Sequence, residues 1–239
     1  MDSHTIITTA IMVTTEAALY RLMTWLSPAY PLGAFSYSHG LEYAVETDLV
    51  RDRDTLCAWA AAAVSHGAGR SDGALLTASW HAVAKSDETA LDDIVELAVA
   101  WRGTAETALE SKAQGAAFLA ATRAAWPHLV LDRLSLRHRG DVVLPVAVGA
   151  AAAAHDVPLA PVLTAYLHAF SSNLVSAGMR LIPLGQSDGQ RAIAALEVDV
   201  ARAVEASMAT PLADIGTAAP MLDWCSMRHE TQYTRLFRS

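Results

Sequence analysis

Residues Pro145–His155 read PVAVGAAAAAH, and this stretch decides the fold that the sequence predicts. Its side chains are almost all those of Ala, Val and Gly, and Pro145 suits the first turn of a helix. The distance between packed helices depends on the side chains at their contact, so small side chains allow a close approach. We therefore expect this segment to be the central and most enclosed helix.

Amphipathic periodicity extends on both sides of this segment, with apolar residues recurring at i, i+3, i+4 and i+7. No alternation of strands and helices appears, so the sequence predicts an all-α fold, one domain of roughly nine or ten packed helices over residues 16–211. The expected helices are Glu16–Leu26, a helix from after Pro31 to about Thr47, Asp52 or Asp54 to about His66, a helix restarting at Ser71 and Asp72, one capped by Ser86-Asp87-Glu88, Ala105–Trp126, Pro145–His155, Pro158–Leu181, and Gly185 to about Met208. Their expected buried faces include Leu19, Leu22, Met23 and Leu26; Leu56, Trp59, Ala60, Ala63 and Val64; and Leu91, Ile94, Val95 and Ala98. Residues 128–140 are expected to be irregular or a short helical turn.

Both ends differ in character from the helical domain. Residues 1–15 are rich in Thr and β-branched side chains, which predicts a loose N-terminal arm or one edge strand. Residues 212–239 combine aromatic and Arg side chains, the types enriched at binding anchors, and show little helical period. We expect this segment to be a C-terminal partner-binding tail.

Composition excludes several functional classes. The 25 acidic and 17 basic residues give a net charge of −8, which argues against a general binder of nucleic acid or anionic membrane. The longest apolar run, Val142–Ala154, is shorter than the roughly 20 residues that span a bilayer. The two cysteines form no disulfide framework, and the N-terminus does not resemble a signal peptide. We expect a soluble, cytoplasmic protein.

Motifs for catalysis and metal binding are weak or missing. Neither phosphate-binding glycine motif occurs, and the nine histidines form no HxH, HxxxH or HExxH pattern. The sequence therefore predicts no enzyme, cofactor or dedicated metal site. Two alternatives stay open: a small serine hydrolase that uses Ser38 and His39, because residues 36–40 weakly resemble a nucleophile elbow, and a nickel carrier that uses Cys225 and His229.

The densest cluster of special residues is Ser27–Glu42, SPAYPLGAFSYSHGLE. Its two prolines predict that one helix ends near Ser27 and that the next begins after Pro31. In a helix, Phe35, His39 and Glu42 would lie on one side. We interpret the stretch as a rigid corner between two helices, whose aromatic and polar groups serve packing and partner contact.

Three long motifs resemble those of one family. Ser27–Glu42 is similar to the N-terminal signature of the UreF family of urease accessory proteins. Ser172–Arg191, SNLVSAGMRLIPLGQSDGQR, resembles its second signature, and His229–Ser239, HETQYTRLFRS, resembles its C-terminal one. The motifs occur in the order of the family, so the resemblance covers nearly the whole chain.

The resemblance implies an all-α homodimer that acts in urease maturation by nickel insertion. It implies binding to UreD (also called UreH), and through it to apo-urease, together with recruitment of the GTPase UreG and modulation of its GTPase step. In this implied role the protein is a scaffold and not the nickel ligand. The expected partner-binding residues are Tyr30, Phe35, Ser36, His39 and Glu42; Gly185, Gln186 and Gln190; and Arg228, His229, Glu230, Tyr233, Arg235, Leu236 and Phe237.

Overall fold

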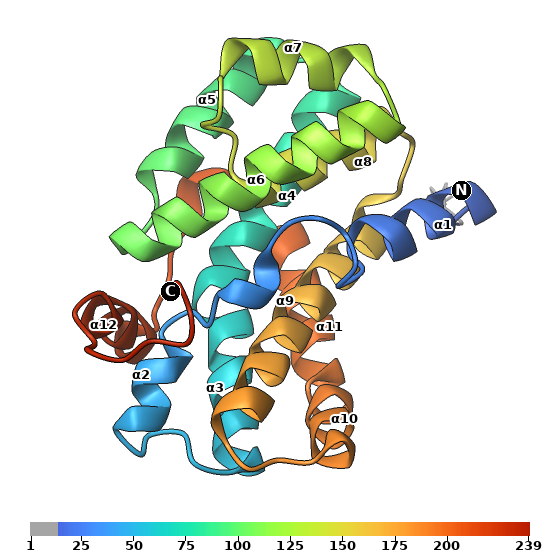
Figure 1. The fold of residues 1–239 in the computed structure, drawn as a ribbon. Helices are drawn as coiled ribbons and strands as arrows, with labels where there is room; N and C mark the ends of the chain where they lie inside the picture. The colour runs from blue at the N-terminus through green and yellow to red at the C-terminus, as the bar shows by residue number, and fades with distance from the viewer. Residues whose placement is uncertain (1–13) are drawn as a thin grey trace, which may run out of the picture.

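A computed structural model describes residues 14–239, so the arm or edge strand expected at the N-terminus lies almost entirely outside the described residues. The described chain is all-α and contains no strand, which confirms the expected fold class (Figure 1). Its α-helices are α1 Glu16–Trp25, α2 Leu41–Glu46, α3 Arg53–Ser65, α4 Ala68–Ala84, α5 Glu88–Ala100, α6 Ala105–Ala125, α7 Leu129–Arg137, α8 Leu144–Ala154, α9 Leu159–Leu181, α10 Gln186–Ala195, α11 Glu197–Ala209 and α12 Pro220–His229. Two 3₁₀ turns, Ala34–Ser36 and Leu212–Asp214, complete the described elements.

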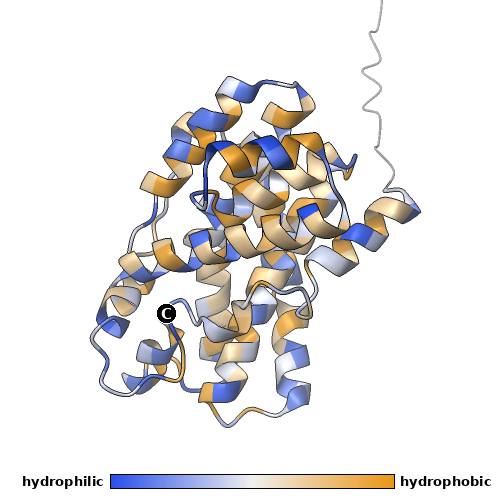
Figure 2. Cartoon of the chain, turned by 45° about the horizontal axis from the view of Figure 1, so that its top comes forward, coloured by the Kyte–Doolittle hydropathy of each residue, from blue (hydrophilic) through white to orange (hydrophobic). Residues whose placement is uncertain are grey.

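Helix α8 is enclosed as its sequence predicts. Its residues from Pro145 to Ala152 are all buried, and its main packing partners are α4 and α6. A Cβ added at Gly149 would collide with the Leu76 carbonyl oxygen and with Ser79 Oγ, so the glycine lets α4 approach α8 closely. Figure 2 shows the apolar residues gathered on the inner helices, whereas hydrophilic residues are more frequent on the outer ones.

The buried faces of α3 and α5 are those that the spacing predicts. Helix α3 buries Leu56, Trp59, Ala60, Ala63 and Val64, and α5 buries Leu91, Ile94, Val95 and Ala98. Asp52 and Asp87 cap the two helices by accepting hydrogen bonds from the backbone N–H groups of Thr55 and Ala90. Periodicity and capping agree in these two helices, which is why both were predictable.

The expected buried face of α1 is only partly correct. Leu22 is buried, but Leu19 and Met23 are exposed, and Trp25 is buried in their place. The Trp25 indole makes edge contacts with Phe118 and Trp126. Because an aromatic side chain buries the largest apolar area, Trp25 determines which face of α1 turns inward.

The single helix expected between Pro31 and Thr47 is wrong. Gly33, His39 and Gly40 have φ values of 71°, 54° and 74°, and a right-handed helix cannot pass through such residues. The chain instead forms a 3₁₀ turn at Ala34–Ser36, extended backbone at Tyr37, and then the short helix α2. Phe35, His39 and Glu42 therefore do not share a helical stripe.

Four other expectations need correction. Residues 128–140 contain a helix, α7, because the His128 ring caps it and Leu131 and Leu134 are buried one turn apart. The helix expected from Gly185 to Met208 is divided near Leu196 into α10 and α11. Helix α4 begins at Ala68, so Ser71 and Asp72 are buried inside it and do not cap it. The tail contains a helix, α12, which packs against α2 and α6.

Candidate functional site

Glu42 holds the tail against the domain. Its carboxylate, which is buried on α2, accepts hydrogen bonds from the backbone N–H groups of Leu236 at 2.6 Å and Phe237 at 2.9 Å. One of its oxygens, Oε2, also lies 3.1 Å from Nε2 of His229. A single carboxylate thus fixes both the end of α12 and the segment that follows it.

His229 links three helices at the base of the tail. Its side chain has no exposed surface, and its Nδ1 lies 2.8 Å from Oε2 of Glu106 on α6, opposite the contact with Glu42. Both ring nitrogens of His229 thus face a carboxylate oxygen. The Arg235 guanidinium adds a cation 3.1 Å from Glu106. The two carboxylates, the imidazole and the guanidinium connect α2, α6 and the tail.

A second histidine–carboxylate pair lies one turn further along α6. His39 Nε2 is 3.1 Å from Glu110 Oε1, and Glu110 also accepts hydrogen bonds from Gln114 and from the Ser239 hydroxyl. Burial opposes a charged imidazole, but the charge and hydrogen bond of Glu110 outweigh it, so the pKa of His39 is raised above its usual value. Glu106, Glu110 and Gln114 therefore form a polar stripe on α6 that the loop and the tail cover.

The tail also runs beside the Ser27–Glu42 stretch. The Ser38 N–H and hydroxyl both donate to the Ser239 carbonyl oxygen, at 2.5 and 2.7 Å, and the Arg238 N–H donates to the Ser36 carbonyl oxygen. Ser38 is buried by these contacts, and the His39 ring is paired with Glu110. The geometry therefore gives no support to the serine hydrolase alternative, which requires these two side chains to act on each other.

Arg180, in the second motif, stacks between two aromatic rings from the other two motifs. Its guanidinium carbon lies 3.5 Å from the centroid of the Phe35 ring and 4.3 Å from that of Phe237. Its Nη1 also donates to the Phe35 carbonyl oxygen. Cation–π contacts of this kind stabilise an arrangement by about 0.5–1 kcal/mol where the groups are partly exposed. The three motifs thus meet at one point of the fold.

The expected site residues divide by exposure and by position. Three of them, Glu42, His229 and Phe237, are buried and make internal contacts, so a partner cannot reach their side chains in this conformation. Tyr30, Ser36 and His39 are half-buried, and the exposed members are Phe35, Gly185, Gln186, Gln190, Arg228, Glu230, Tyr233, Arg235 and Leu236. In Figure 1 the start of α10, which carries Gly185 and Gln186, lies at the lower right, whereas α12 and the tail lie at the left. The C-terminal part of the second motif, at the start of α10, therefore lies away from α12 and the tail.

Several residues of the site were not predicted. Glu106 and Glu110 were missed, although their i, i+4 spacing places both on one face of α6. Three exposed side chains of α12, Met221, Trp224 and Met227, are spaced to form an apolar stripe, and Trp224 contacts the ring of Tyr43 edge-on. Because we expected no helix in the tail, the i, i+3 spacing of these three residues did not indicate that they share one face.

A buried charge cluster lies deeper, between α4 and α9. Arg102 Nη1 donates to Asp72 Oδ1 at 2.7 Å, and the Tyr166 hydroxyl donates to Asp72 Oδ2 at 2.7 Å. Burial and the charge of Asp72 raise the pKa of Tyr166 well above its ordinary value, so this phenol stays protonated. This cluster adjoins a cavity of about 450 Å³ that the Ser27–His39 loop covers.

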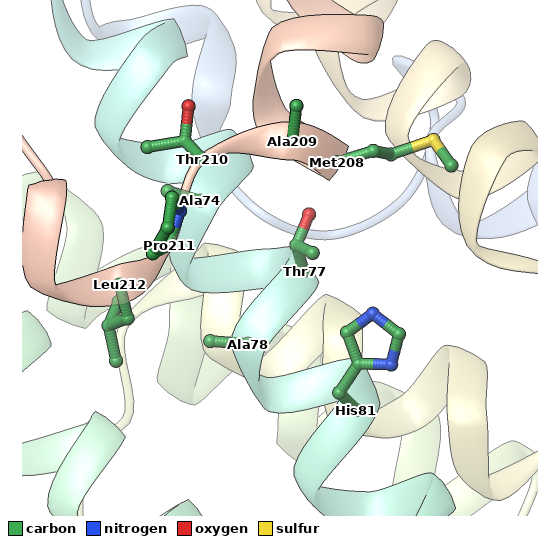
Figure 3. A pocket seen from close by; sticks show the side chains of 9 residues that line it. All are labelled: Ala74, Thr77, Ala78, His81, Met208, Ala209, Thr210, Pro211 and Leu212. Atoms are coloured by element: carbon green, nitrogen blue, oxygen red, sulfur yellow. The ribbon is translucent and has the colours of Figure 1, made fainter.

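In residues 14–239 no three His, Cys, Asp or Glu side chains converge to hold a metal ion. The Cys225 thiol is buried, burial raises its pKa to about 11, and both nitrogens of His229 already face carboxylates. A smaller pocket of about 250 Å³ between α4 and the end of α11 has only one titratable side chain, that of His81 (Figure 3). Among the described helices none is long and apolar enough to cross a bilayer.

Comparison with known proteins decides the family. A model of the UreF family matches residues 50–197. The chain belongs to the UreF family. It is 55% identical to the "Urease accessory protein UreF" of Granulibacter bethesdensis over 95% of this chain and 96% of the relative. The proteins of that name from Rhodopseudomonas palustris strain BisB5 and Bradyrhizobium diazoefficiens are 53% and 50% identical, over 94% and 93% of this chain and 92% of each relative. Membership of the UreF family supports a role in urease maturation, and it confirms the family that the three motifs indicate.

Proposed function

We propose that this protein is a non-enzymatic scaffold in the nickel-dependent maturation of urease, acting in the cytoplasm. In this proposal it binds UreD (UreH) on apo-urease, recruits UreG and modulates the GTPase step of UreG. Nickel is the cargo of the assembly, and this chain does not ligate it. The support is the family membership, together with the finding that no three metal-ligating side chains converge in residues 14–239.

The main observation behind the proposal is that the backbone of the tail is fixed while several of its side chains are exposed. Glu42 fixes the backbone at Leu236 and Phe237, while the Tyr233 side chain between α12 and this anchor is fully exposed. Arg228, Trp224 and Leu236 are exposed on the same segment. Aromatic and Arg side chains on a fixed backbone bind a partner with little loss of conformational entropy. We assign the first partner contact to this tail surface, defined as Met221, Trp224, Met227, Arg228, Tyr233 and Leu236.

Sequential co-purification tests the proposed function. The full-length chain, expressed separately, is expected to retain UreD at micromolar concentration, and the resulting complex is expected to retain UreG. A chain ending at Ala219 lacks the whole tail surface and is expected to lose UreD. If full-length protein captured neither partner, or if the truncated chain captured UreD as well as full length does, the proposal would be wrong.

The proposal includes a homodimer, as the family resemblance implies. Light scattering of the purified chain after size exclusion is expected to give a mass close to twice the 25.4 kDa of one chain. A single-chain mass at about 100 µM would contradict this part of the proposal, whereas the tail assignment is tested separately by the capture of UreD.

A further inference from the structure

The cavity under the Ser27–His39 loop has walls of two kinds. Loop residues, together with helices α4, α6 and α9, enclose its volume of about 450 Å³. Leu32, Leu144 and Phe170 contribute apolar surface, whereas charged groups come from Asp72, Arg102, Glu110 and His39. An apolar cavity with a few converging polar groups is the usual form of a small-molecule site.

Every carboxylate oxygen of the cavity already has a partner. Asp72 accepts from Arg102 at one oxygen and from Tyr166 at the other. Glu110 accepts from Gln114 and faces His39 at Oε1, and accepts from Ser239 at Oε2. The acidic groups therefore have no free oxygen with which to recruit a cation.

The buried groups of the cavity that lack a hydrogen-bond partner are two guanidinium nitrogens and one imidazole nitrogen. Among the residues that the structure describes, Arg102 Nε, Arg102 Nη2 and His39 Nδ1 are buried and make no hydrogen bond. The Arg102 side chain is only 8% exposed. Nε and Nη2 share one edge of the guanidinium and form the fork that binds two oxygens of a carboxylate side by side. Glu110 raises the pKa of His39 despite its burial, which favours a proton on Nδ1 as well.

We propose that this cavity binds a small free carboxylate, with its two oxygens on Nε and Nη2 of Arg102. A buried donor without a partner is costly, and only an acceptor removes that cost. A water molecule offers one oxygen, whereas a carboxylate matches both arms of the fork. Asp72 is already paired with the Arg102 guanidinium and Glu110 with the His39 ring, so both carboxylates are engaged when an anion binds. This ligand site is separate from the tail surface and from the proposed scaffold function.

Thermal unfolding of the full-length chain tests the site, with sodium formate or acetate replacing chloride at constant ionic strength. A saturable rise in Tm is expected, with a Kd of about 1 mM for so small a ligand and a shift of about 4 °C at ten times that concentration. Arg102→Lys keeps a cation beside Asp72 but lacks the fork, so the rise is expected to disappear and affinity to fall at least about tenfold. Arg133→Lys, at an exposed ion pair with Glu88, is the control and is expected to keep the full rise.

A measurement on the unmodified protein covers the case in which Arg102→Lys does not fold. The NMR resonance of Arg102 Nε is expected to shift on titration with acetate, while that of Arg133 Nε stays in place. Three results would overturn the proposal: no Tm rise beyond that in chloride, an equal rise in Arg102→Lys, or binding of inorganic phosphate in place of acetate. Partner capture by the tail is expected to be unaffected by acetate in every case, so this site and the proposed function fail independently.

Discussion

Glu42 is the residue on which the position of the tail depends, because three hydrogen-bond donors converge on its carboxylate. In Glu42→Gln the amide still accepts one backbone N–H, but the charge that faces His229 is lost. We expect unfolding free energy to fall by about 2 kcal/mol, the usual value for a buried hydrogen bond to a charged group. Hydrogen exchange at Leu236 and Phe237 is expected to accelerate. Glu96→Gln, at an exposed position of α5, is the control, and equal exchange in both variants would contradict this role of Glu42.

His39 predicts how stability depends on pH. Its pKa is raised in the folded state, so its stabilising effect is complete below the unfolded pKa of about 6.5 and is lost as pH rises through the folded value. Urea unfolding between about pH 6 and 9 is expected to show stability falling with pH, and His39→Gln is expected to flatten that slope. The lowered pKa of His155 acts in the opposite direction, on the acid side, and does not mask the effect. An unchanged slope in His39→Gln would exclude the assigned role.

At the scale of the element, Gly149 fixes the distance between α4 and α8. Gly149→Ala raises helix propensity by about 1 kcal/mol, yet its Cβ would overlap the Leu76 carbonyl oxygen and Ser79 Oγ. We expect overpacking to dominate and to lower unfolding free energy by about 2 kcal/mol. Gly185→Ala, where an added Cβ meets nothing closer than 3.9 Å, is expected to cost only about 0.5–1 kcal/mol, because Ala is a poorer N-cap for α10 than Gly. Chemical denaturation of both variants is the test, and a stabilised Gly149→Ala would refute it.

The orientation of α1 gives a second test at this scale. Trp25→Ala is expected to cost about 3–5 kcal/mol, because the indole is fully buried against Phe118 and Trp126. Leu19→Ala is expected to stay within about 0.5 kcal/mol, since Leu19 faces solvent. Urea unfolding measures both variants. If both lost a similar amount of unfolding free energy, the buried face of α1 would be the one that periodicity predicts and not the one that the structure shows.

Elements were predictable where one local signal decided them. Periodicity and an Asp cap sufficed for α3 and α5, and small side chains sufficed for α8. The prediction of a helix after Pro31 was wrong because His39, which is not a glycine, has a positive φ. In the folded protein its side chain contacts Glu110 and Phe170. Such backbone geometry depends on tertiary contacts and leaves little trace in the local sequence.

At the scale of the whole molecule, the three motifs meet around Arg180 and the tail, although they lie far apart in the sequence. The sequence placed the aromatic and Arg residues of the tail at a binding surface, an assignment that remains a prediction. It could not show that Glu42, His229 and Phe237 face inward, because their pairing joins residues almost 200 positions apart. The sequence also could not show the cavity under the Ser27–His39 loop, because its charged groups come from four segments that are separate in the sequence.

The exposed tail surface is the part of the molecule that we propose binds UreD. Calorimetry with purified UreD measures this binding most directly, comparing full-length protein with the double variant Trp224→Ala/Tyr233→Ala. Two lost anchors of about 1.4 kcal/mol each predict a Kd about 100-fold weaker. Tyr20→Ala/Met23→Ala removes a similar exposed area from α1 and is expected to bind UreD like the unmodified chain. Equal affinities for the unmodified chain and the tail variant, or a loss in the α1 variant alone, would contradict the account.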